Sequence, residues 1–80
     1  MFLDVTVISN TRILYRGQAR RVILPGDSGV FEILSFHKRA LSRLLEGIVE
    51  IDDQSFPILR GIAKVEKNNV TIAIEQASNG

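Results

Sequence analysis

The segment Gly26-Asp27-Ser28-Gly29 carries the residue types that surround the reactive serine of chymotrypsin-like hydrolases. That chemistry needs a histidine base, an orienting carboxylate, an oxyanion hole and two barrels to hold them, and in those enzymes the histidine precedes the serine. Here the only histidine, His37, follows Ser28, and 80 residues leave no room for a second barrel. Because short motifs often match by chance, we interpret the segment as a turn between strands.

Metal and cofactor chemistry has equally little support. A zinc site needs several histidine, cysteine or acidic ligands close together, whereas the chain has one histidine, no cysteine and mostly scattered acids. Asp52-Asp53 is a carboxylate pair, but neighbouring strand residues point to opposite faces, so a solvated turn explains it better. The sequence contains no glycine-rich phosphate loop. We expect no catalytic residue, no metal and no cofactor.

Basic and aromatic side chains offer a further possibility, a small β-barrel that binds single-stranded nucleic acid. The candidates are Arg20, Arg21, Lys38, Arg39 and Arg43, with Tyr15, Phe31 and Phe36. Nucleic-acid domains are usually strongly basic, but the net charge here is +1 and the aromatic residues are not closely spaced. Nucleic-acid binding therefore stands as the alternative to protein docking, and a steep dependence on salt would identify it.

The bulk composition indicates a single domain, 1–80, that is 45% hydrophobic along its whole length. A chain of this size buries only about 60–65% of the surface that its unfolded form exposes, so a deep catalytic cleft is not expected. Residues 1–43 carry a net charge of +4 and residues 44–80 a net charge of −3. Such polarity steers partners more than it determines a fold. The composition favours a docking module over an enzyme.

The N-terminal stretch Met1–Ser9 is apolar but does not have the features of a targeting signal. Asp4 interrupts it and no basic region precedes it, so we predict a strand there and not a signal peptide. No run in the chain approaches the roughly 18 apolar residues of a spanning helix. We expect a protein that is neither secreted nor embedded in the bilayer.

Alternation with a period of two predicts strands over most of the chain, most clearly at 3–7 and 70–74. Further short apolar runs occur at 13–15, 22–24, 30–34, 48–51, 56–59 and 61–65. Pro25 cannot donate to a ladder, so the strand before it must end there or lie at an edge. Asn68 and Asn69 tolerate the left-handed backbone of a tight turn. Short strands separated by frequent turns are typical of a sandwich or a barrel.

The segment His37–Glu46 fits this pattern least well. Leu41, Leu44 and Leu45 have helical spacing, and Gly47 stands where a helix C-cap would lie. Propensity alone therefore predicts a helix in this segment. Packing against flanking strands can override that preference, which leaves a strand as the alternative.

Taken in order, the turns and strands resemble those of the N-terminal domain of the epsilon subunit of F-type ATP synthases, the subunit called delta in mitochondria. The resemblance spans nearly the whole chain. It rests on Leu3-Asp4-Val5, Tyr15-Arg16-Gly17, Leu24-Pro25-Gly26, Gly29-Val30-Phe31, Ile33-Leu34, His37, Leu41, Leu45-Glu46-Gly47, Gly61-Ile62, Val65 and Asn69-Val70-Thr71-Ile72. The order and spacing of the glycines, which suit turns between strands, carry most of its specificity.

This resemblance implies an all-β fold, a small flattened β-sandwich of about ten short and mostly antiparallel strands. It also implies that 37–46 is a turn followed by a strand, and we follow it over the helical propensity. The family usually has proline two residues after the histidine, whereas this chain has Arg39. That difference leaves the backbone of 36–40 open and keeps the helical alternative.

The resemblance further implies a non-catalytic rotor subunit that links the gamma subunit to the membrane c-ring and couples proton or sodium ion translocation to ATP synthesis. By position, Ser9, His37 and Ser42 would lie on the gamma side and Gly29, Val30 and Phe31 on the ring side. The implied location is the cytoplasmic face of the bacterial inner membrane, as a peripheral part of the synthase. We expect a monomer when the chain is isolated, with no nucleic acid bound and no membrane insertion.

Most members of that family continue into a C-terminal helical hairpin that restrains ATP hydrolysis and, in some bacteria, binds ATP. The sequence given ends at Gly80, before such a hairpin. It matches a short form of the subunit, and a truncated piece of a longer one would look the same. We expect these residues to support coupling without restraining hydrolysis and without binding ATP.

Overall fold

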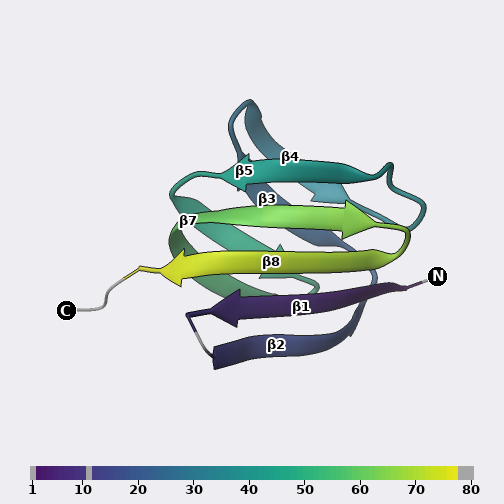
Figure 1. Cartoon of the computed structure of the whole chain (residues 1–80), viewed down its shortest axis with the longest axis horizontal. Helices are drawn as coiled ribbons and strands as arrows, with labels where there is room; N and C mark the ends of the chain where they lie inside the picture. Colours follow the sequence, from purple (N-terminus) through teal and green to yellow (C-terminus); the bar gives the residue numbers. More distant parts are fainter. Residues whose placement is uncertain (1, 11, 78–80) are drawn as a thin grey trace.

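The computed structural model describes residues 2–10 and 12–77, which form eight strands (Figure 1). The strands are β1 (Leu3–Ser9), β2 (Arg12–Ala19), β3 (Val22–Gly26), β4 (Gly29–Ile33), β5 (Ala40–Leu44), β6 (Gly47–Ile51), β7 (Gln54–Glu66) and β8 (Asn69–Gln76). The described residues contain no helix, and so none that is long and apolar enough to cross a membrane.

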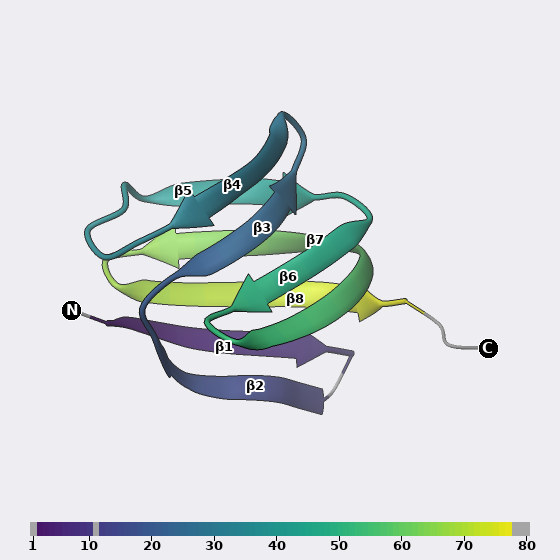
Figure 2. The same ribbon diagram turned by 180° about the vertical axis from the view of Figure 1, so that it is seen from behind.

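The strands form two layers that share β7. The broad sheet has the order β2-β1-β8-β7-β5, and the narrow sheet consists of β4, β3, β6 and the first part of β7. Figure 2 shows β3, β4 and β6 crossing the broad sheet at an angle. With dimensions of 38 × 26 × 21 Å, the domain is the small flattened β-sandwich that the sequence predicts.

The long strand β7 accounts for one of the strands by which the observed eight fall short of about ten. Its residues 54–58 pair with β6 and its residues 58–66 pair with β8, so two apolar runs that look separate in the sequence are one bent strand. The register shifts between Ile58 and Arg60, and a bulge of this kind bends a strand. The bend carries the chain from one layer to the other.

The core lies between the layers and is built from alternate residues of the strands. In β1 and β8 every second side chain is buried, in agreement with the predicted period of two. Burying one aliphatic side chain contributes about 1.5–3 kcal/mol. The buried apolar residues are Leu3, Val5, Val7, Ala19, Val22, Leu24, Ile33, Leu44, Val49, Ile51, Ile58, Ala63, Val65, Val70, Ile72 and Ile74.

The first and last strands pair in parallel, in register from Asp4 beside Asn69 to Ser9 beside Ile74. All the other strand pairs are antiparallel. Figure 1 shows the consequence, because the N-terminal start of β1 and the C-terminal end of β8 lie at opposite ends of the domain. The middle of the broad sheet is therefore made from the two ends of the chain.

The segment 40–44 is the strand β5, so the strand implied by the resemblance is confirmed and the helix suggested by propensity is wrong. Leu44 is fully buried, but Leu41 is 73% exposed and Leu45 is also exposed. The three leucines therefore do not form one buried helical face. Pairing of β5 with β7, from Ala40 beside Val65 to Leu44 beside Gly61, outweighs the local preference.

Two turn expectations are also tested. Pro25 lies one residue before the end of β3, where the strand is about to stop, in keeping with its missing N–H. In the β7–β8 turn the left-handed residue is Lys67, with φ of 57°, and neither asparagine has positive φ. The Asn68 side chain instead accepts a hydrogen bond from the Phe36 backbone N–H, at 3.2 Å. The asparagine serves as a tether between loops.

Candidate partner-binding surfaces

The outer face of the broad sheet carries an apolar row that crosses four strands. Ile13 of β2 pairs with Ile8 of β1, Ile8 pairs with Ala73 of β8, and Ala73 pairs with Ile62 of β7. Ile13 and Ile62 are both about half exposed. An ordered row of this kind presents apolar area on rigid strands, which suits protein docking better than isolated exposed side chains do.

A groove of about 770 Å³, which we call the broad-sheet groove, overlaps this row and includes Ile8, Ala73 and Ile62 in its lining. Its lining residues are Ile8, Asn10, Arg43, Leu44, Leu45, Glu46, Leu59, Arg60, Gly61, Ile62, Ala73, Ile74 and Glu75. The floor is mostly aliphatic. A β-carbon at Gly61 would lie 2.6 Å from the Ala73 carbonyl oxygen, so only glycine fits the close approach of β7 to β8.

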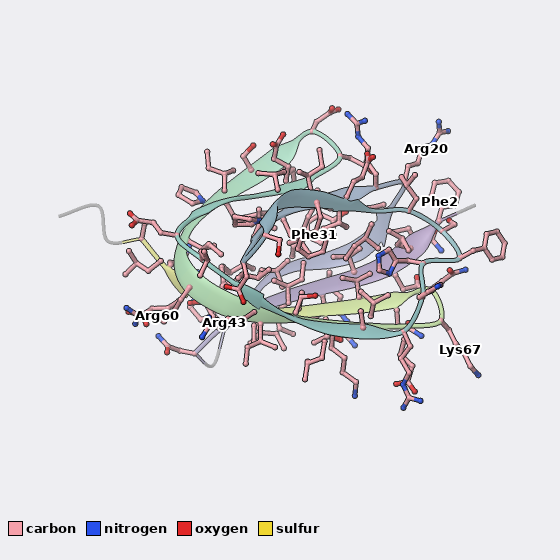
Figure 3. The ribbon with its side chains drawn as sticks, turned by 90° about the horizontal axis from the view of Figure 1, so that it is seen from above. Phe2, Arg20, Phe31, Arg43, Arg60 and Lys67 are labelled. Atoms are coloured by element: carbon pink, nitrogen blue, oxygen red, sulfur yellow. The ribbon has the colours of Figure 1, made fainter. Side chains whose placement is uncertain are left out.

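Two arginines, Arg43 and Arg60, line the broad-sheet groove, and both are labelled in Figure 3. The Arg60 Nη1 atom lies 2.6 Å from Glu75 Oε1, and the Arg43 Nε atom lies 3.4 Å from Asp27 Oδ1. All four side chains are half or more exposed. Solvated ion pairs of this kind contribute little to stability, so both guanidinium groups can turn to a partner at small cost.

Ser9 lies at the end of β1 beside this groove, but it is only 6% exposed. It pairs with Arg12 of β2 on one side and with Ile74 of β8 on the other. Its neighbours Ile8 and Asn10 line the groove. A partner at this place would therefore touch those neighbours more than the serine hydroxyl.

A second groove, of about 480 Å³, lies between the β3–β4 hairpin and β5, and we call it the hairpin groove. It is lined by Gly26, Asp27, Ser28, Gly29, Val30, Phe31, His37, Leu41, Ser42 and Arg43. The structure thus brings His37 and Ser42 together with Gly29, Val30 and Phe31, and it places Ser9 elsewhere. Gly29 has φ of 115°, a conformation that requires glycine and lets the hairpin close tightly.

His37 is half-buried in the hairpin groove, and its Nδ1 atom lies 2.7 Å from the Lys38 carbonyl oxygen. Since a carbonyl only accepts, this contact requires a proton on Nδ1. No hydrogen bond joins His37 to Ser28 within the described ranges. The pair therefore lacks the contact that a serine nucleophile and its base require.

The preceding residue, Phe36, was considered from the sequence only as an aromatic residue of the nucleic-acid alternative, and its unusual backbone geometry was not predicted. Its φ is 68°, and its ring is 74% exposed. Bulky residues rarely adopt this left-handed backbone, which costs about 1–2 kcal/mol. No sequence signal marked the strain, because it arises from the tether to Asn68 and from the turn in which His37 N–H donates to the Leu34 carbonyl.

Three of the five cations proposed for nucleic-acid binding, Arg21, Arg39 and Arg43, lie in exposed ion pairs within the chain. The backbone N–H groups of Arg20 and Arg21 donate to the Asp52 carboxylate, at 3.0 and 3.2 Å. The Arg21 side chain pairs with Glu32, and Arg39 pairs with Glu66. In residues 2–10 and 12–77, no group of three potential metal-ligating side chains is present. The structure gives the nucleic-acid alternative no support.

The architecture is a small β-sandwich with two neighbouring surface grooves, both lined by Arg43. Comparison with known proteins identifies the family. Residues 2–80 match the family model described as ATP synthase, Delta/Epsilon chain, beta-sandwich domain. The chain therefore belongs to this family, as the resemblance implied. The expectation of a non-catalytic subunit domain agrees with that family.

Curated relatives support the assignment over the full chain. The match to the ATP synthase epsilon chain of Gloeothece citriformis is 34% identical and covers 100% of this chain and 61% of the relative. The epsilon chain of Synechococcus elongatus is 36% identical, with the same coverage. The chain thus spans about three fifths of the length of these relatives.

Two solved structures share the fold. A chain in the Euglena gracilis mitochondrial ATP synthase, described as OSCP/F1/c-ring, aligns with a TM-score of 0.87 and 18% identity, covering 96% of this chain and 52% of that chain. A chain in the central stalk/c-ring structure of the Tetrahymena thermophila mitochondrial ATP synthase aligns with a TM-score of 0.76 and 16% identity, covering 92% and 63%.

Proposed function

We propose that this chain is a central-stalk (rotor) component of an F-type ATP synthase, that it links the gamma subunit to the membrane c-ring, and that it thereby couples proton or sodium ion translocation to ATP synthesis. The observation that carries the proposal is the family match over residues 2–80. The same role would place it at the cytoplasmic face of a bacterial inner membrane, as a peripheral part of the complex.

The two grooves suggest how one small domain could hold two partners. We assign the broad-sheet groove, with Ser9 behind it, to the gamma side, and the β3–β4 hairpin at Gly29, Val30 and Phe31 to the ring side. His37 and Ser42 lie at the boundary, since they line the hairpin groove together with Arg43, which lines both grooves. The broad face measures about 38 × 26 Å, enough for the roughly 800 Å² per partner of an ordinary interface.

Reconstitution of a synthase that lacks its own epsilon subunit tests the proposal. With this chain added, ATP-driven ion pumping should return while ATP hydrolysis stays uninhibited, because these residues include the sandwich and no stalk helices. Pumping and hydrolysis would be measured side by side. No gain in pumping, with the chain folded and present, would refute the proposal, and strong inhibition of hydrolysis would show that the sandwich itself regulates.

Substitution in the hairpin tests the ring-side assignment separately. Val30 is 74% exposed, so Val30→Asp should leave the fold intact but reduce pumping by placing an unpaired charge in an interface. Ser28→Ala, two residues away on the same turn, is the matched control and should pump normally. If Val30→Asp pumped as well as the unmodified chain, the hairpin would not face the ring.

A further inference from the structure

The outer face of the narrow sheet presents a further surface, which adjoins Val30 of the hairpin but lies beyond the residues that the proposed role assigns to the ring. We call it the acidic face and define it by Ile23, Glu32, Ile48, Glu50 and Pro57. Alternation fixes its orientation, because the neighbours of Ile23 in β3, and Val49 and Ile51 in β6, are buried in the core. The acidic face is therefore turned away from the core, over the four adjacent strands β4, β3, β6 and β7.

The acidic face has two ordered rows. In the first, Ile23 pairs with Glu32 of β4 on one side and with Glu50 of β6 on the other, so an apolar side chain stands between two carboxylates. In the second, Ile48 pairs with Pro57 of β7. Neighbouring strands lie about 4.8 Å apart, so the two glutamates are about 10 Å apart across the sheet.

Charge on the acidic face is poorly balanced. Arg21 Nη1 lies 3.4 Å from Glu32 Oε2, in a pair whose side chains are 57% and 41% exposed, so the pair is weak. Within the part of the chain that the structure describes, Glu50 has no ion-pair partner. Ile48 is 52% exposed beside it. The face thus offers apolar area next to unneutralised negative charge.

We propose that the acidic face docks a basic amphipathic helix from another protein. A helix rises 1.5 Å per residue, so positions i and i+7 are about 10.5 Å apart on one face, with i+3 or i+4 between them. Lys or Arg at i and i+7 would meet Glu32 and Glu50, while an apolar residue between them covers Ile23. The adjacent apolar stripe of the helix would lie on Ile48 and Pro57.

Other occupants fit the acidic face less well. A second copy would bring like charges together, which destabilises an interface, and an anionic lipid surface would repel the glutamates. Single exposed apolar residues are normal on any protein. Here they stand in register on paired strands, so little conformational entropy is lost when a partner binds.

A titration of the full chain, observed by amide NMR, tests the inference with a defined probe. The probe is a synthetic Leu/Lys amphipathic helix with Lys at i and i+7, and its counterpart has Glu at every Lys position. The Lys peptide should shift amides of β3, β4 and β6, and the Glu peptide should not. Shifts centred on the broad sheet, or equal binding of the two peptides, would overturn the proposal.

Charge reversal locates the site more sharply. Glu50→Lys should raise the Kd for the Lys peptide about fivefold, which corresponds to a loss of ~1 kcal/mol of binding free energy. Ile48→Ser should raise the Kd by about as much. Glu75→Lys, an equal change in net charge on the broad sheet, is the control and should alter Kd less than about twofold. Equal loss of affinity from Glu50→Lys and Glu75→Lys would show that binding depends only on net charge and would refute the site.

Dimerisation of the chain through this face, or binding to anionic vesicles, would also refute the proposed site. None of these measurements involves the gamma subunit or the ring, so their failure would leave the proposed rotor role untouched.

Discussion

The β7–β8 hairpin and the connection between β4 and β5 meet at Asn68, yet different kinds of contact hold them in place. The hairpin buries Val65, Val70 and Ile72 in the core and pairs without interruption from Arg60 beside Glu75 to Glu66 beside Asn69. The connection instead depends on the hydrogen bond from Phe36 N–H to the Asn68 side chain and on one turn bond. The conformation of the hairpin is determined by burial, which the alternation in the sequence reveals. The conformation of the connection is determined by a few directional hydrogen bonds, which the alternation does not reveal.

The largest effect should come from the hairpin. Ile72 is fully buried, so Ile72→Ala should lower the free energy of unfolding by about 3 kcal/mol, through lost transfer energy and the cavity left behind. Ile62→Ala, on the exposed face of the same sheet, is the control and should cost under about 1 kcal/mol. Urea unfolding measures both. Similar losses from the two changes would mean that the core has been wrongly located.

The contribution of the β4–β5 connection to stability should depend on backbone strain more than on burial. At Phe36, whose φ is 68°, Phe36→Gly should be more stable than Phe36→Ala by about 1 kcal/mol, because glycine adopts the left-handed region without the β-carbon clash. Both variants remove the exposed ring, so their difference isolates the backbone. Thermal unfolding gives the comparison. An alanine variant as stable as the glycine variant would argue against a left-handed Phe36.

Loss of the hydrogen bond between Asn68 and Phe36 should have a smaller effect on the free energy of unfolding. Asn68→Ala removes the acceptor of the Phe36 N–H bond and should cost about 0.5–1.5 kcal/mol. Hydrogen exchange at the Phe36 amide should accelerate, while exchange in β8 should change little. The matched variant Asn69→Ala is the control. If exchange at Phe36 stayed unchanged, the connection would be held by something other than this bond.

The smallest effect should come from the groove rim. Arg60→Ala removes the pair with Glu75, whose two side chains are more than half exposed, so the free energy of unfolding should change by less than about 0.5 kcal/mol. Denaturant unfolding at low and high salt would measure it. A loss above about 1 kcal/mol would show that this arginine is structural and not free to meet a partner.

The same contrast explains what could be predicted from the sequence. The strict alternation at 3–7 and 70–74 was enough to predict β1 and β8 and their buried faces. The strand at 40–44 could not be obtained from its own residues, because the spacing of Leu41 and Leu44 also fits a helix and only pairing with β7 decides. The continuity of β7 was hidden by its bend. Tertiary pairing supplied what local pattern lacked.

The candidate surface residues could be suggested from the sequence, but the way they are grouped could not. The sequence resemblance suggested Gly29, Val30 and Phe31 as one surface and Ser9, His37 and Ser42 as another. The structure gathers five of these six around the hairpin groove and buries Ser9. Neither the approach of β5 to the β3–β4 hairpin nor the rows of the acidic face are visible in one sequence, because each depends on the register between strands distant in the chain.

The parallel pairing of β1 with β8 has a mechanical consequence. Since the start of β1 and the end of β8 lie at opposite ends of the domain (Figure 1), a force that pulls the two ends apart acts along both strands in opposite directions. The hydrogen bonds over the six paired positions, from Asp4 to Ser9, are then loaded in shear and must break together. An antiparallel hairpin pulled from its open end would lose its bonds one after another. This arrangement makes the domain resist extension when it is pulled along its long axis.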